Sequence, residues 1–204
     1  MKIIKLEKKS DKKNTFEVFF DDGKNILLSA DIIVKFGFNK GVEISDHIYK
    51  EAISADKTYR IIFDALTLVG RRAYSEKTLY DKLLQKGYEE DNSKAAIARL
   101  KELEYIDDEK YALNYTKYLF GKGKGEIFIR VELAKKGISK DLTDKILSSL
   151  KTEEEEYEQI IKTIKIKFKN FNADNPREVR RAANYFLRRG FSSEDISKAF
   201  RRIS

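Results

Sequence analysis

The residues of this 204-residue chain that are best suited to chemistry are basic side chains gathered in clusters. Such side chains bind phosphate or carboxylate groups, and the planar guanidinium of arginine can do so with two parallel hydrogen bonds. We expect the clusters together to form a binding surface, although any single residue also fits a solvated helix face with local ion pairs. The candidate residues for binding phosphate or carboxylate groups are Arg71, Arg72, Lys122, Lys124, Arg130, Lys135, Lys136, Lys162, Lys165, Lys169, Arg177, Arg180, Arg181, Arg188 and Arg189.

Residue types that support catalysis or metal binding are sparse. His47 is the only histidine and cysteine is absent, so we expect neither a histidine-based acid–base pair nor a thiolate metal site. The acidic run Asp107–Glu109 could hold magnesium, but we favour its role as the start of a helix. The segment Gly121–Gly125, GKGKG, lacks the Walker spacing and a preceding strand, which favours a flexible basic linker. We predict no catalytic residues, no metal and no cofactor.

Two further groups leave alternatives open. The acidic block Glu153–Glu156 fits a solvated helix start, and contact with a partner is the alternative. Tyr111, Tyr115 and Tyr118 are spaced to share one helix face. For them we favour packing in a core over a platform on which nucleic-acid bases stack.

The distribution of charge and hydrophobicity narrows the class of protein. Of a net charge of +8, residues 151–204 carry +4, and residues 159–204 hold 12 basic and 4 acidic side chains. This basic C-terminal third predicts affinity for polyanions. Hydrophobic residues make up 41% of the chain, enough for a folded core. No apolar stretch reaches signal-peptide or membrane-spanning length, so we expect a soluble cytoplasmic protein with no membrane contact.

One local pattern occurs three times, around Gly87, Gly137 and Gly190. Each glycine has apolar residues four and eight positions before it, a basic residue immediately before it and an apolar residue immediately after it. The apolar pair marks the buried stripe of a helix, and glycine ends that helix because the next residue needs a positive φ. Each copy therefore predicts a helix, a tight glycine turn and a second helix in a tandem array.

The elements that position the candidate residues follow from this pattern. Three short apolar runs and the pair Asp22-Gly23 predict a small sheet with a hairpin within residues 1–50. Asp31–Phe38 fits either a strand or a helix, and Ser45–Ala55 has helical character. Pro176 suits the first turn of a helix. Helices are predicted at 57–70, 75–86, 90–104, 107–120, 125–136, 140–150, 154–170, 176–189 and 193–203.

These elements define a fold class and a domain organisation. We predict a mainly α protein with three tandem three-helix repeats in an elongated curved array, preceded by a small N-terminal β-rich segment. A repeat array of this kind presents a long surface and buries a core shared between neighbouring repeats. The predicted boundaries are 1–50 for the β-rich segment and 56–104, 105–150 and 153–204 for the repeats.

Four passages resemble the RecX family, bacterial regulators of the RecA recombinase. The resemblance covers about residues 56–204, and the β-rich segment is similar to an extension carried by longer members. The ordered set of passages carries it, since each alone is weak. The passages are RRAYSE-x2-L-x3-L-x2-KGY from Arg71, LEYIDDEKYA from Leu103, KGKG-x3-I-x2-EL-x2-KGI from Lys122 and Y-x-LRRGFS-x3-I from Tyr185.

The resemblance implies a monomeric modulator without catalytic residues. It implies binding in the helical groove of the RecA–ssDNA filament, with restraint of ATP turnover, strand exchange and coprotease action, and weak binding to single- or double-stranded DNA. The residues by themselves leave a second class open, a stand-alone basic nucleic-acid-binding module with no recombinase partner. An enzyme such as a nuclease would need a carboxylate cluster that Asp107 and Asp108 alone do not supply.

Overall fold

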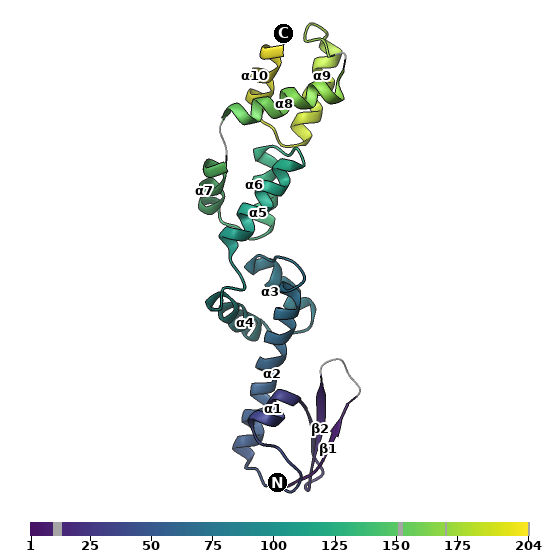
Figure 1. The fold of residues 1–204 in the computed structure, drawn as a ribbon, viewed down its shortest axis with the longest axis vertical. Coiled ribbons are helices and arrows are strands. Elements are labelled where there is room, and N and C mark those ends of the chain that lie inside the picture. The colour runs from purple at the N-terminus through teal and green to yellow at the C-terminus, as the bar shows by residue number, and fades with distance from the viewer. Residues whose placement is uncertain (10–13, 151–152, 170, 204) are drawn as a thin grey trace. The chain divides into compact units, whose positions relative to one another are not determined.

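The computed structural model describes residues 1–9, 14–150, 153–169 and 171–203. Within these residues the strands are β1 (Ile3–Lys8), β2 (Thr15–Phe20) and β3 (Asn25–Ser29) (Figure 1). The helices are α1 (Ala30–Lys35), α2 (Asp46–Val69), α3 (Glu76–Gln85), α4 (Glu90–Glu102), α5 (Asp108–Gly121), α6 (Glu126–Lys135), α7 (Lys140–Leu150), α8 (Glu153–Lys167), α9 (Pro176–Arg188) and α10 (Ser193–Ile203). The chain divides into two compact units, one of Met1–Arg72 with Leu79–Tyr105 and one of Ala73–Thr78 with Ile106–Ser204.

The β-rich segment forms an antiparallel sheet with the strand order β1-β2-β3. Val18 of β2 pairs with Leu6 on one side and Ile26 on the other, which places three apolar side chains on the same face. This face packs on α1 and α2, and Val18 is completely buried there. Gly23 has a φ of +85° in the turn between β2 and β3, as predicted from the Asp-Gly pair.

The segment between sheet and repeats is more helical than the sequence indicated. Residues 30–35 form α1, which decides the open alternative for Asp31–Phe38 in favour of a helix. Helix α2 runs without interruption for 24 residues, so it joins the helical character of Ser45–Ala55 to the helix predicted at 57–70. The continuity has a packing reason at Asp56, which is buried and accepts a hydrogen bond from the Ser29 amide at 2.7 Å. This contact ties the middle of α2 to the end of β3.

Three sets of three helices follow one packing scheme. In each set the first helix contacts the third: α2 packs on α4, α5 on α7, and α8 on α10. The second helix of each set supplies the apolar residues that the sequence pattern predicted to be buried. These residues are Leu79 and Leu83, Ile129 and Leu133, and Ala182 and Phe186. The mainly α class with a small N-terminal sheet is therefore confirmed.

The three predicted glycine turns all have the expected geometry. Gly87, Gly137 and Gly190 have φ values of +88°, +80° and +85°. The amide of the residue after each glycine donates back to a carbonyl five residues earlier, with distances of 3.3, 3.1 and 3.2 Å in chain order. This is the Schellman cap, which satisfies free carbonyls at the end of a helix.

Three of the predicted helix starts, those of α5, α9 and α10, are also confirmed. Asp107 caps α5 by accepting a hydrogen bond from the Lys110 amide at 2.9 Å, the role favoured for the acidic run. Ser192 caps α10 and hydrogen-bonds the Asp195 side chain. Pro176 occupies the first turn of α9, and the Asn175 side chain accepts from the Arg177 amide at 3.1 Å. These caps supply partners for backbone amides that a helix start leaves free.

Two further segments singled out in the sequence are Gly121–Gly125 and Glu153–Glu156. The segment Gly121–Gly125 is a tight turn, because α5 ends at Gly121 and Gly125 caps α6. The predicted linker between two helices therefore takes the form of a short turn. Helix α8 begins at Glu153, but the side chains of Glu153–Glu156 lie outside the described residues, so their predicted solvation has no structural comparison.

Candidate polyanion-binding surface

Helix α9 presents a row of arginines, here called the arginine row, which consists of Arg177, Arg180, Arg181 and Arg188. Steps of three and four residues place side chains on one helix face. The opposite face carries Ala182 and Phe186, both buried in the core of the third repeat. Burial of that face therefore turns all four arginines outward, and all four are exposed.

The positive charge of the arginine row is not neutralised within the part of the chain that the structure describes. No carboxylate of the described residues forms an ion pair with any of the four guanidinium groups. The one acidic residue of α9, Glu178, instead accepts a hydrogen bond from the Asn172 amide at 2.8 Å. Glu178 therefore binds the preceding turn, and the arginines keep their capacity for an external anion.

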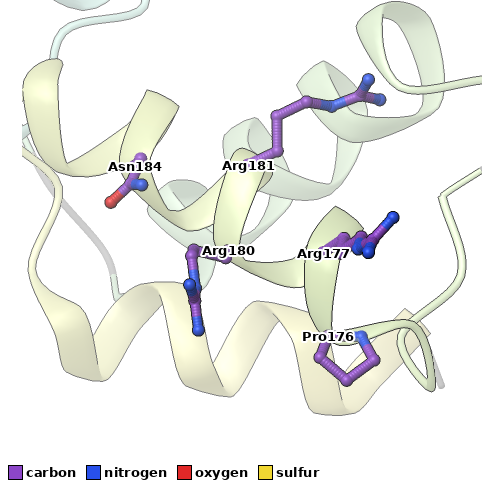
Figure 2. Close-up of a pocket in the computed structure, with 5 residues that line it drawn as sticks. All are labelled: Pro176, Arg177, Arg180, Arg181 and Asn184. Atoms are coloured by element: carbon purple, nitrogen blue, oxygen red, sulfur yellow. The ribbon is translucent and has the colours of Figure 1, made fainter.

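The first part of the row surrounds an open hollow of about 440 Å³. Pro176, Arg177, Arg180, Arg181 and Asn184 line it, and Figure 2 shows the three arginine side chains leaving α9 in different directions. Arg181 lies against the ring of Phe168, with its guanidinium carbon 5.4 Å from the ring centroid. A diverging set of guanidinium groups suits an extended polyanion or a broad acidic protein surface better than one small anion.

The basic residues of the second repeat are arranged differently. Arg130 is ion-paired with Glu126 at 2.6 Å and also with Asp144, and the hydrogen bond to Asp144 is the main reason that its pKa is raised. Lys135 pairs with Glu132 at 2.7 Å. The cations of α6 therefore already have internal counter-charges, in contrast to the arginine row.

Four other predicted residues contact aromatic rings or backbone carbonyls. Lys122, Lys124 and Lys136 place their ammonium groups over the rings of Tyr118, Phe128 and Tyr115, at 5.6, 3.9 and 5.9 Å from the centroids. Arg189 donates from Nε to the Gly123 carbonyl at 2.8 Å and from its terminal nitrogen to the Lys122 carbonyl. Arg189 therefore joins the end of α9 to the turn between α5 and α6.

The remaining predicted residues are exposed but are not gathered with the row by any contact of the described residues. Lys162, Lys165 and Lys169 are exposed on α8 and just after it. Arg71 and Arg72 are exposed after α2, in the other compact unit. Among the described residues, the arginine row gathers four exposed cations on one helix face, whereas Lys162 and Lys165 form a smaller pair on a face of α8.

Two residues near these basic groups were missed by the sequence reasoning. Asn184 lines the hollow beside the row, and its position three residues after Arg181 was a signal that could have found it. Lys167 places its ammonium group 4.3 Å from the centroid of the Tyr185 ring, a contact between two helices that spacing alone does not predict. Both residues lie in the basic third repeat.

Three further observations on the described part of the chain concern its histidine, metal binding and membrane insertion. His47 is exposed and lies 3.8 Å from the Glu51 carboxylate, in an ordinary surface contact. Among the described residues, no three or more histidine, cysteine or acidic side chains gather as a metal site would require. None of the described helices is both long and apolar enough to cross a membrane.

The three repeats match models of a known protein family. Family models described as the first, second and third three-helix domains of RecX match residues 64–100, 107–147 and 153–200 in the same order as the three repeats. The chain belongs to the RecX family. A RecX protein named "Regulatory protein RecX" from Caldanaerobacter subterraneus subsp. tengcongensis is 31% identical over 198 residues, covering 97% of this chain and 96% of the relative.

Two further RecX proteins match at least 94% of the chain. The "Regulatory protein RecX" of Clostridium perfringens is 30% identical over 209 residues, covering 100% of this chain and 96% of the relative. The one from Bacillus subtilis is 31% identical and covers 94% and 74% of the two chains. Because these relatives extend over the N-terminal residues, the β-rich segment belongs to the matched region of the RecX family.

Two solved RecX structures share the fold. A "Crystal structure of regulatory protein RecX" superposes with a TM-score of 0.71 at 22% identity, covering 96% of this chain and 97% of the other. The RecX from Lactobacillus salivarius has a TM-score of 0.66 at 25% identity, covering 72% and 97%. The first match therefore extends over both the sheet and the repeats, whereas the second covers less of the chain.

Proposed function

We propose that this chain is a regulatory protein that binds the RecA–ssDNA filament in its helical groove and inhibits the ATPase, strand-exchange and coprotease activities of RecA. It acts by occupying the filament and carries out no reaction of its own. The membership of the RecX family and the regulatory names of the relatives support this proposal.

The arginine row on α9 is the single observation that carries the proposal. A filament of RecA on DNA offers phosphates and acidic side chains, and both bind guanidinium groups through charge-assisted hydrogen bonds. The four arginines are exposed and have no ion-pair partner among the described residues, so binding would not first require breaking an internal ion pair. Within the full predicted set of basic residues, we therefore assign the strongest contribution to this row.

A protein of this kind gains affinity by adding weak contacts. Once one repeat is bound, the others act at high effective concentration, so modest contacts sum along the filament. Contacts between charges are screened by salt, and we expect inhibition to weaken as ionic strength rises.

The test is a titration of RecA ATP hydrolysis on single-stranded DNA at low salt. The variant R177Q/R180Q/R181Q/R188Q removes the row, and the control K57Q/K110Q/K117Q/K140Q removes the same number of charges from exposed lysines elsewhere. A third variant replaces the four arginines by lysine, which keeps the charge but loses the planar fork.

We expect the wild type and the lysine control to suppress hydrolysis at sub-stoichiometric amounts, and the glutamine variant to need at least about tenfold more protein, a loss of about 1.4 kcal/mol. The arginine-to-lysine variant should lie between them. Unchanged hydrolysis with equimolar wild type would refute the filament proposal. Equal potency of the glutamine variant and the wild type would remove the arginine row from the site. Tight DNA binding without any effect on RecA would favour the alternative, a stand-alone nucleic-acid-binding module.

A further inference from the structure

A row of tyrosines runs along the outside of α5. The rings of Tyr111 and Tyr115 lie 5.8 Å apart with planes inclined by 28°, and those of Tyr115 and Tyr118 lie 6.2 Å apart with planes inclined by 14°. Tyr118 is 56% exposed, while Tyr111 and Tyr115 are partly buried against the core of the second repeat. The core therefore holds one side of this row and leaves Tyr118 open to solvent.

Lysines border the same row. Lys136 at the end of α6 lies over the Tyr115 ring, and Lys122 at the end of α5 lies over the Tyr118 ring. The acidic residue Glu132 also contacts the row and receives a 3.4 Å hydrogen bond from the Tyr115 hydroxyl. Its charge is already offset by Lys135, whose hydrogen bond is the main cause of its lowered pKa. The row, called here the tyrosine–lysine strip, is thus aromatic and cationic together.

We propose that the tyrosine–lysine strip, formed by Tyr111, Tyr115, Tyr118, Lys122 and Lys136, binds single-stranded nucleic acid. A base stacks on the exposed side of Tyr118 in place of the Lys122 ammonium, which moves aside and, with the ammonium of Lys136, contacts neighbouring phosphates. Aromatic rings interleaved with cations are the arrangement by which proteins hold single strands without reading their sequence, because every base has a π-face and every nucleotide a phosphate.

The geometry favours a single strand over a duplex. Bases within a duplex are stacked on each other, so their faces are not available to a side chain on a protein surface. Tyr118, a residue that is 56% exposed, can instead receive an unstacked base, and the neighbouring Tyr115 ring packs beside it. The lysines contribute little by themselves to such selectivity, because ammonium groups contact the phosphates of both forms.

The strip goes beyond the proposed action on RecA and can be tested without it. Fluorescence anisotropy of a labelled 20-nucleotide oligo-dT measures binding to the full-length chain, and an abasic oligonucleotide of the same length presents the same phosphates without bases. The variants are Y118A, which removes the ring, and Y118F, which retains it. Y105A is the matched control, because Tyr105 is 57% exposed and belongs to the other compact unit.

Loss of one stacked base predicts about 5- to 100-fold weaker binding of oligo-dT by Y118A. We expect Y118F and Y105A to bind within about twofold of the wild type. The abasic strand should bind the wild type and Y118A equally weakly. Equal binding of oligo-dT and the abasic strand by the wild type would overturn the proposal, because the contact would then be purely ionic. Wild-type affinity in Y118A, or an equal loss in Y105A, would also overturn it. RecA inhibition that fails while these results hold would leave the strip established and reject only the filament proposal.

Discussion

Gly190 packs directly against the backbone of Phe128, across the contact between the third and second repeats. A Cβ added at Gly190 would lie 2.8 Å from Phe128 Cα and closer still to its amide nitrogen. The adjoining backbone is hydrogen-bonded as well: the amides of Gly125 and Ile127 donate to the carbonyls of Arg189 and Gly190 at 2.8 and 2.9 Å. The end of α9 thus supplies acceptors for the start of α6, and backbone hydrogen bonds join the two repeats.

This contact predicts that two glycines of the same sequence pattern respond differently to substitution. Gly87→Ala should cost about 1–2 kcal/mol, because its positive φ is strained for alanine but no atom lies within 4 Å of the added Cβ. Gly190→Ala should cost about 3 kcal/mol or more, because it adds overlap with Phe128 to the same strain. Urea unfolding of the two variants measures the difference. Equal losses would show that the close approach is not important for stability.

Adjacent arginines at the end of α9 should separate stability from binding. Arg189→Gln is expected to lower the free energy of unfolding by about 1–2 kcal/mol, since Arg189 donates to the carbonyls of Lys122 and Gly123. Arg188→Gln should change it by no more than about 0.5 kcal/mol, because Arg188 is exposed and has no ion-pair partner among the described residues. Thermal unfolding at one ionic strength compares them, and a larger loss for Arg188→Gln would contradict the prediction.

The stability of the first compact unit should depend on Tyr88 at alkaline pH. Burial, followed by the 3.0 Å hydrogen bond from the Tyr88 hydroxyl to Asp64, raises the pKa of Tyr88 to about 12 from an ordinary value of 10.0. Between pH 10 and 12 the unfolded chain has lost a proton that the folded chain retains, so the free energy of unfolding falls as pH rises. The contribution of Tyr88 is complete below pH 10.

Tyr88→Phe is the variant that isolates this effect. The difference in unfolding free energy between wild type and Tyr88→Phe should be constant up to about pH 9 and should shrink between pH 10 and 12. Urea unfolding at several pH values gives this difference. A difference that stays constant or grows through that interval would show that the hydroxyl is not protected in the folded chain.

The sequence was sufficient for those elements in which local pattern and burial agree. The helix predicted at 125–136 corresponds to α6 at Glu126–Lys135, because Ile129 and Leu133 define one buried stripe and Gly137 ends the helix. The cap at Asp107 followed from the preference of carboxylates for the start of a helix. Such features depend on residues fewer than ten positions apart.

Features that depend on contacts between distant residues were not predictable in this way. The glycines of Gly121–Gly125 suggested a linker, but the turn is held by Arg189, more than 60 positions further along the chain. The candidate basic residues are mostly lysines in the second repeat and mostly arginines in the third, but residue type does not show which of them are paired. Arg130 has ion pairs with Glu126 and Asp144, while the arginine row has none among the described residues. Composition gives the number of charges, and only the packed helices decide which of them are neutralised.

The starts of α6 and α9 differ in the hydrogen-bond partners of their backbone amides. At the start of α6, the backbone amides of Gly125 and Ile127 donate hydrogen bonds to carbonyls in the turn of the following repeat. At the start of α9 the equivalent amides are those of Asn175 and Arg177, and they already donate to the Asn172 carbonyl and the Asn175 side chain, both at 3.1 Å. A further module could not dock there by the same backbone exchange. The capping turn before α9 therefore closes this helix start to the backbone hydrogen bonds that join the second and third repeats.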